Sequence, residues 1–205
     1  MSSLQVQGTH SQDSVTTDSD GSKVGEVIFL LNSLPIIEHH PGPLQRILSS
    51  ELNAAGLIRH IIVDFGEIGC YEIKTNARPM NRVVPFTNQL RRLFLTGSVL
   101  NENGEDVWLV RDHFSVLLST TPTNFRKIGC IHGTGFLNHE PGPIGNLDDY
   151  IRAASNEQVL LFVIGRMDPR ILSRVDDLVN VIDYPRPTDE LNRIIELLEH
   201  KWGIA

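Results

Sequence analysis

Residues 158–165 read QVLLFVIG, and this stretch decides the fold class. Every position between Gln158 and Gly165 is apolar. A strand without polar alternation must be covered on both faces, which is typical of a parallel sheet with helices on either side. The run is too short to span a bilayer as a helix, which takes about 20 apolar residues. The stretch therefore predicts the buried centre of an α/β sheet.

The segments around this stretch alternate between strand and helix patterns. Strands are predicted over 26–31, 57–63, 70–74, 107–110, 114–118, 125–131, 158–165 and 178–182, and helices over 44–55, 83–95, 148–154 and from Thr188 to 202. We expect Gly56 to cap the first helix, and 57–63 and 70–74 to form a hairpin. Such alternation predicts an α/β fold with a mainly parallel sheet flanked by helices.

The composition is that of a globular chain of one large domain. Of the 205 residues, 40% are hydrophobic and 21% are charged. Residues 1–25 are rich in Ser, Thr and Asp and have no apolar core, so we expect a disordered tail rather than a targeting segment. Residues 26–205 then form a single domain. Two cysteines, Cys70 and Cys130, exclude a disulfide framework and favour a reducing compartment.

The charge is unevenly distributed. The net charge is −7, yet residues 73–101 contain no Asp or Glu and five basic residues, so the rest carries −12 (−7 minus 5). A local basic field binds anions whatever the total charge. The segment predicts contact with RNA phosphates, and the alternative is a solvated helix face that lacks acids by chance. These five residues are Lys74, Arg78, Arg82, Arg91 and Arg92.

Standard catalytic motifs are missing from the sequence. No phosphate-binding glycine pattern, GxSxG or HExxH is present. His39 and His40 are adjacent, which is poor geometry for one metal, so we expect no metal site. His60 is interpreted as a surface or hydrogen-bonded histidine, and both cysteines as small buried residues rather than nucleophiles.

Several segments carry a resemblance to a known family when taken in order. They are LNAAGLIRHIIVDFGEIGCYEIKTNAR (52–78), FRKIGC (125–130), FVIGRMDPR (162–170), VIDYP (181–185) and the terminal WGI (202–204). Together they resemble the ribosome-biogenesis rRNA pseudouridine-N1 methyltransferases, the EMG/NEP family of the SPOUT superfamily. The chain is similar to a divergent member, and the resemblance covers most of residues 26–205.

The resemblance implies a fold, an activity and partners. The expected fold is a SPOUT-type α/β domain whose C-terminal part forms a trefoil knot. The expected activity is S-adenosylmethionine-dependent methylation of N1 of a pseudouridine in small-subunit rRNA. The implied partners are that rRNA, a second copy in a homodimer and pre-ribosomal assembly factors, with no membrane, in the nucleus and nucleolus.

The resemblance also assigns roles to residues. By position in the family pattern, the expected cofactor-binding residues are Cys130, His132, Gly165, Arg170, Val181, Ile182, Asp183, Tyr184, Pro185 and Arg186. The expected RNA-binding residues are Arg78, Arg82, Arg111 and Lys74, of which Arg78 is the one that matches an arginine of the family's RNA-binding element. Glu38 falls where the family has an Asp that orients an arginine or acts as a base. Glu72 matches a family Glu that we expect to be structural.

Departures from the family pattern define the alternative. Arg170 replaces a glycine near the expected cofactor, Arg186 places a cation beside a sulfonium ligand, and Pro187 lacks a backbone donor. A second family arginine is Asn81 here, with Arg82 one position on. These changes leave open a catalytically eroded relative that serves as an rRNA-binding small-subunit assembly factor.

Overall fold

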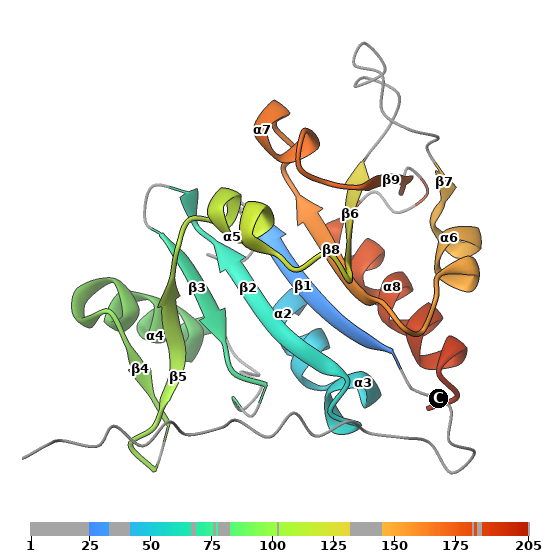
Figure 1. Ribbon diagram of the computed structural model, residues 1–205. Helices are drawn as coiled ribbons and strands as arrows, with labels where there is room; N and C mark the ends of the chain where they lie inside the picture. Colours follow the sequence, from blue (N-terminus) through green and yellow to red (C-terminus); the bar gives the residue numbers. More distant parts are fainter. Residues whose placement is uncertain are drawn as a thin grey trace, which may run out of the picture.

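The computed structural model describes residues 25–32, 42–66, 69–75, 77, 83–101, 103–131, 145–181, 183 and 186–204 (Figure 1). Of the tail predicted over 1–25, residues 1–24 lie outside the described part. Gly25 is buried, and a Cβ on it would lie 2.6 Å from the Trp202 ring. The start of the described chain is therefore packed against its last turn.

One nine-stranded sheet organises the described residues, in the order β4-β5-β3-β2-β1-β8-β6-β9-β7. The strands are β1 (Glu26–Asn32), β2 (Ile58–Asp64), β3 (Cys70–Ile73), β4 (Val99–Leu100), β5 (Asp106–Arg111), β6 (Phe125–Ile131), β7 (Gly145–Asn146), β8 (Val159–Gly165) and β9 (Asp177–Asn180). From β2 to β7 all neighbours are parallel, whereas β3, β5 and β4 extend the sheet antiparallel. The predicted mainly parallel α/β sheet is confirmed.

Helices cover both faces of the sheet. They are α2 (Gly42–Leu48), α3 (Glu51–Ala54), α4 (Val83–Thr96), α5 (Phe114–Thr120), α6 (Leu147–Ala153), α7 (Pro169–Leu172) and α8 (Pro187–Lys201). One core lies between the sheet and α2, α3, α4, α6 and α8, and a smaller one lies beneath α5 and α7. Figure 1 shows α5 in front of the sheet and α2 and α3 behind it. No helix within the described ranges is long and apolar enough to cross a membrane.

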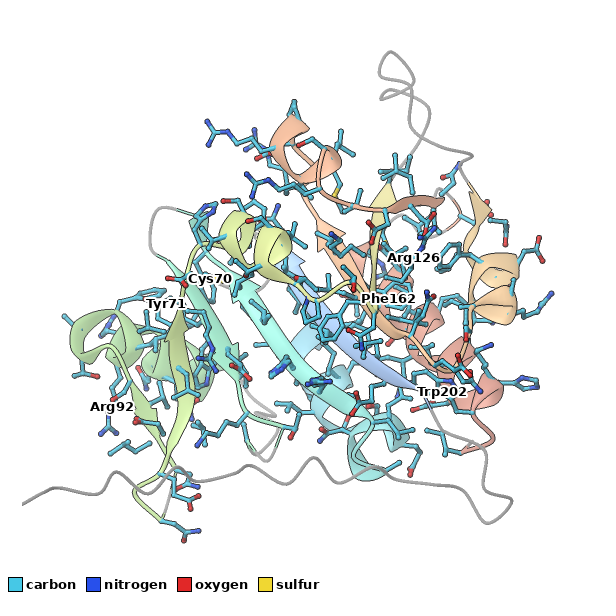
Figure 2. All side chains as sticks on the ribbon, in the orientation of Figure 1. Cys70, Tyr71, Arg92, Arg126, Phe162 and Trp202 are labelled. Carbon is cyan, nitrogen blue, oxygen red and sulfur yellow. The ribbon has the colours of Figure 1, made fainter. Side chains whose placement is uncertain are left out.

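The central strand β8 is buried as its sequence predicts. Its residues from Val159 to Ile164 are all buried, and Phe162 stacks on Phe29 of β1 with ring centroids 6.4 Å apart. Figure 2 shows Phe162 in the middle of the sheet. The last helix is likewise confirmed: its predicted apolar positions Leu191, Ile194, Ile195 and Leu198 are fully buried, and Trp202 caps the helix. Burial on both sides fixes β8 as the core of the parallel part.

Residues 114–118 form a helix, so the strand predicted there is wrong. Phe114 and Leu118, four residues apart, are both buried in the smaller core, which is the spacing of a helix face. His113 caps this helix, because its side chain accepts a hydrogen bond from the Ser115 amide. Alternation over a short apolar run does not distinguish the two structures.

Two helix boundaries also differ from the prediction. The helix predicted over 44–55 is interrupted at Ser50, whose hydroxyl donates to the Ile47 carbonyl (2.6 Å) and accepts from the Asn53 amide (3.2 Å). This capping starts α3 as a separate helix. At the C-terminal helix the N-cap is Arg186 rather than Thr188, since Pro187 occupies the first helical position, for which its fixed φ is suited.

Candidate functional site

The strands β6 and β8 part at their carboxyl ends. Their pairing runs only to Gly129 and Val163. Beyond this point β6 continues to Ile131 against β9, while β8 continues to Gly165 against β1. The carboxyl ends of β6 and β8 therefore pair with different neighbouring strands.

The direction of the chain reverses between β1 and β8, which are neighbours in the sheet. After β1 the chain passes through α2, which buries Ile47 in the larger core, to β2 on one side. After β8 it passes through α7, which buries Ile171 in the smaller core on the other face, to β9 on the other side. Such a reversal is a topological switch point, and ligands of open α/β sheets bind there, outside the carboxyl ends of the strands. The fold therefore marks the end of β8 as a ligand site.

The loop after β8 is held by Asn32 at the end of β1. The Arg166 amide donates to the Asn32 carbonyl (3.1 Å), and the Asn32 side chain donates to the Arg166 carbonyl. Gly165 has φ of 112°, a conformation that side chains rarely adopt. Asp168 caps α7 through the Arg170 amide (2.8 Å), and the Arg170 side chain is exposed. The predicted cofactor loop 165–170 is thus an ordered turn at the carboxyl end of β8.

The second predicted cofactor loop starts at the neighbouring strand end. The Val181 amide donates to the Ile131 carbonyl (3.0 Å), so the end of β9 is tied to the end of β6. Asp183 is exposed, and the exposed Arg186 guanidinium pairs with both oxygens of Asp189 at 2.7 and 2.9 Å. Three other predicted members, Ile182, Tyr184 and Pro185, lie outside the described residues. Gly165 and Val181 therefore end the two strands that flank β6.

Cys130 lies near the carboxyl end of β6 and is fully buried. Burial, and next the nearby carboxyl of Glu190, hold the pKa of Cys130 well above its ordinary value. The thiol therefore stays protonated and has no nucleophilic role. Glu190 belongs to the first turn of α8 and is itself fully buried, which the sequence pattern did not indicate. The predicted neighbour His132 lies outside the described residues, as does Glu38.

The predicted RNA contacts are partly described. Arg111 pairs with Glu72, with 2.5 Å from its Nε to the carboxylate, and His60 Nδ1 lies 2.6 Å from the other oxygen. Burial alone raises the pKa of Glu72, but the hydrogen bonds from His60 and Arg111 hold it below its ordinary value. Lys74 is half-buried at the end of β3. Arg78 and Arg82 lie outside the described residues, and the expected structural role of Glu72 agrees with these contacts.

A row of residues in register connects the two predicted sites. Gly165 is level with Asn32, Asn32 with Asp64, Asp64 with Cys70, and Cys70 with Arg111. At roughly 4.8 Å between strands, the row spans about 19 Å along one edge of the sheet. Its ends are a predicted cofactor glycine and a predicted RNA-binding arginine. Asn32 and Asp64 were missed by sequence reasoning, and their one signal is a polar residue that directly follows an apolar strand.

Metal chemistry has no support among the described side chains, since no three His, Cys, Asp or Glu residues there come together as ligands. The groups that meet at the carboxyl ends of these strands are instead backbone amides, Gly165, the side-chain amide of Asn32 and the carboxyl of Asp64. This arrangement suits a small organic ligand that lies across strand ends, with polar groups recognised by the backbone.

Comparison with known proteins identifies the fold. No protein-family model matches the sequence, and a search of curated proteins finds no match. Among solved structures, Archaeoglobus fulgidus Nep1 bound to S-adenosylhomocysteine matches 88% of this chain and 99% of its own, with a TM-score of 0.60 and 10% identity. A probable methyltransferase of Bordetella pertussis Tohama I matches 87% of this chain and 96% of its own, with a TM-score of 0.48 and 11% identity. The chain therefore has the fold of the archaeal Nep1 protein over most of its length.

Proposed function

We propose that this protein is an S-adenosylmethionine-dependent methyltransferase. The observation that carries the proposal is the switch point at the carboxyl ends of β1 and β8, where Asn32 holds the loop that follows Gly165, in a fold shared with a protein that binds S-adenosylhomocysteine. Fold alone does not give function, whereas the strand ends at a switch point are where an open α/β sheet binds its ligand. The family resemblance of 162–170 and 181–185 falls on the two loops that begin there.

The residues at this edge fit the proposed cofactor. Gly165 lets a ligand approach the backbone, and the Val181 end of β9 forms the opposite side, whereas Cys130 is fully buried beneath the strand ends. When bound, the cofactor supplies an activated methyl group on a sulfonium. The chain needs only to hold the acceptor nitrogen in line with that methyl group and to remove its proton, so no covalent nucleophile is required.

The departures from the family pattern favour retained binding over the eroded alternative. Arg170 is exposed, and the charge of Arg186 is balanced by its bidentate contact with Asp189. Pro187 stands at the first position of α8, where an amide has no partner within the helix, so its missing donor costs little. The replacements therefore leave a cationic ligand acceptable. An rRNA-binding assembly factor without catalysis remains the outcome expected if the cofactor fails to bind.

The finer proposal is methylation of N1 of a pseudouridine in small-subunit rRNA. It is supported by the resemblance and by the acid-free basic stretch 73–101, of which Arg91 and Arg92 are exposed on α4. With it we propose action as a homodimer, together with pre-ribosomal assembly factors, in the nucleolus. Light scattering at micromolar concentration should give the mass of two chains, and a monomer mass would contradict the dimer.

Calorimetric titration with S-adenosylmethionine and S-adenosylhomocysteine tests the cofactor. We expect both to bind, and no heat at millimolar ligand would overturn the enzyme. Gly165→Ala should weaken binding at least tenfold, because a side chain would intrude where the ligand meets the backbone. Gly97→Ala is the control: its φ of 73° is also positive, and no atom lies within 4 Å of the added Cβ. The control should bind as the wild type does.

A further inference from the structure

The carboxyl of Asp64 stands at the centre of the row that joins Gly165 to Arg111. In-register neighbours on adjacent strands point to the same face of a sheet, so Asp64 lies beside Asn32, which anchors the loop after β8. Two strand spacings, roughly 10 Å, separate Asp64 from Gly165. Asn32 occupies the register position between them, so Asp64 lies one strand away from the residue that anchors the loop after β8.

The two oxygens of Asp64 differ. Oδ1 accepts a hydrogen bond from the Gly66 amide at 2.8 Å, which fixes the side chain. Oδ2 is buried and has no hydrogen-bond partner among the described residues, although Asp64 is only 1% exposed. A buried polar atom without a partner costs free energy, and native proteins keep few of them. The oriented carboxyl therefore has one oxygen for which the described residues supply no donor.

Asp64 is the residue of this row whose side chain can act as a base. Burial, as the largest effect, raises its pKa, the Gly66 hydrogen bond and His113 lower it, and Asp168 raises it. The neighbouring Cys70 (Figure 2) has its pKa raised to about 12 by burial and by Asp64, so the thiol accepts no proton near neutral pH. A carboxylate whose pKa lies above the ordinary range removes protons more effectively at neutral pH.

We infer that Asp64 Oδ2 accepts the proton of the ring N–H of the base that receives the methyl group. This inference rests on the proposed methyltransferase function and adds a catalytic residue to it. As the nitrogen gives its proton to Oδ2, its electron pair forms the bond to the methyl carbon, and the electrons of the carbon–sulfur bond remain on sulfur. Asp64 then releases the proton to water, so atoms and charge balance.

The test compares two aspartates, each of which has one buried carboxyl oxygen without a hydrogen-bond partner among the described residues. Asp64→Asn removes the proposed base, and Asp106→Asn is its matched control, because Asp106 Oδ1 is also buried without a partner. Asp106 is the first residue of β5, and Arg111, which belongs to the row, is its last. The control position therefore lies roughly 16 Å from the row, measured along β5. Both variants are titrated with S-adenosylmethionine and then assayed for single-turnover methyl transfer. The acceptor is a pool of RNA hairpins with randomised, pseudouridine-containing loops.

We expect Asp64→Asn to bind S-adenosylmethionine like the wild type and to transfer methyl about 10²- to 10⁴-fold more slowly, with the rise of the rate with pH abolished. Asp106→Asn should match the wild type in binding, rate and pH profile. A pool made with N1-methylpseudouridine, which lacks the N–H, should accept no methyl.

The inference is overturned if Asp64→Asn retains the wild-type rate, or if the wild-type rate does not rise with pH. Asp64→Ser serves as a second variant should the asparagine variant fail to fold. Failure of the wild type to bind S-adenosylmethionine or to methylate the pool would overturn the proposed function and the role of Asp64 with it. A fully active wild type beside a fully active Asp64→Asn would overturn the role of Asp64 alone.

Discussion

Two carboxyls on neighbouring strands respond to burial in opposite ways. Glu72 has both oxygens in contact with cationic or donor groups, so its charged form is stabilised although it is mostly buried. Asp64 has one oxygen on a backbone amide and one without a partner among the described residues, so burial dominates and its charged form is disfavoured. The same residue chemistry thus gives a structural anchor on β3 and a poised base on β2.

Stability should depend on pH with opposite sign at these two positions. The folded pKa of Glu72 lies below 4.5, so its contribution is present above that pH and is lost as pH falls through the folded value. The folded pKa of Asp64 lies above 3.8, so its contribution is present below that pH and is lost as pH rises through the folded value. At pH 7 we expect Glu72→Gln to be less stable than the wild type and Asp64→Asn to be more stable.

Urea unfolding at several pH values measures both differences. The Asp64→Asn difference should shrink as pH falls toward 4, whereas the Glu72→Gln difference should begin to shrink only below pH 4.5, because protonation makes each carboxyl resemble the amide that replaces it. A destabilisation by Glu72→Gln that is constant with pH would show that its charge is not what holds Arg111 and His60 in place.

Single residues were predictable where burial or type alone decides. Cys70 and Cys130 are buried as expected of small apolar side chains, and His60 is hydrogen-bonded. The position of Asp64 was not predictable, because the row to which it belongs is created by register between strands that are far apart in the sequence. No local pattern places residue 64 between residues 32 and 70.

At the scale of elements, the strands of the parallel half were predictable because their apolar runs are continuous. The strand predicted over 125–131 coincides with β6, and β8 begins one residue later than expected. The helix α5 was mistaken for a strand because seven residues carry too little periodicity to separate the two patterns. The switch point could not be predicted from local patterns, since it depends on the order in which the strands lie in the sheet.

Gly129 on β6 is expected to tolerate no side chain. A Cβ there would lie 2.8 Å from Leu178 and 3.3 Å from Val175, so the layer beside β9 would have to move. We expect Gly129→Ala to cost about 1–3 kcal/mol, the usual penalty of overpacking a core. Gly42→Ala is the control, because no atom lies within 4 Å of its added Cβ and the residue opens α2. Equal urea midpoints for the two variants would contradict this packing.

Helix α6 is attached to the parallel sheet through a polar contact. The Tyr150 hydroxyl donates to Asp177 Oδ2 at 2.6 Å, and the Arg126 guanidinium pairs with the same carboxylate, 2.7 Å from Oδ1. Tyr150→Phe should cost about 1.5–3 kcal/mol, the range for a hydrogen bond to a charged group. Its urea unfolding midpoint should fall without a change of slope, and an unchanged midpoint would exclude a contribution of this bond to stability.

Across the whole molecule, the sheet has two halves with different chemistry. The parallel half, from β1 to β7, contains the switch point and the residues proposed to bind the cofactor. The antiparallel half, from β3 to β4, is continuous with the basic stretch, and Arg92 lies on α4 at that end of the molecule (Figure 2). The trefoil knot stays a prediction, because 132–144, Ile182, Tyr184 and Pro185 lie outside the described residues.

The salt dependence of RNA binding tests whether the antiparallel half holds the substrate. If all five basic residues of 73–101 contact single-stranded phosphates, the logarithm of affinity should fall with the logarithm of salt with a slope of about −3 to −4. Arg91 and Arg92 are exposed on α4, so reversing both to Glu should remove two contacts and flatten the slope by about 1.4.

The matched control reverses Arg152 and Lys201 to Glu, because it changes the net charge equally but lies on α6 and α8, outside the basic stretch. A control that flattens the slope as much would mean that total charge rather than this segment attracts RNA. Binding of the same hairpin pool at several salt concentrations distinguishes the two, because only local contacts release counterions in proportion to the arginines removed. A reduced slope with unchanged S-adenosylmethionine affinity would therefore place RNA attraction and cofactor binding in separate halves of one sheet.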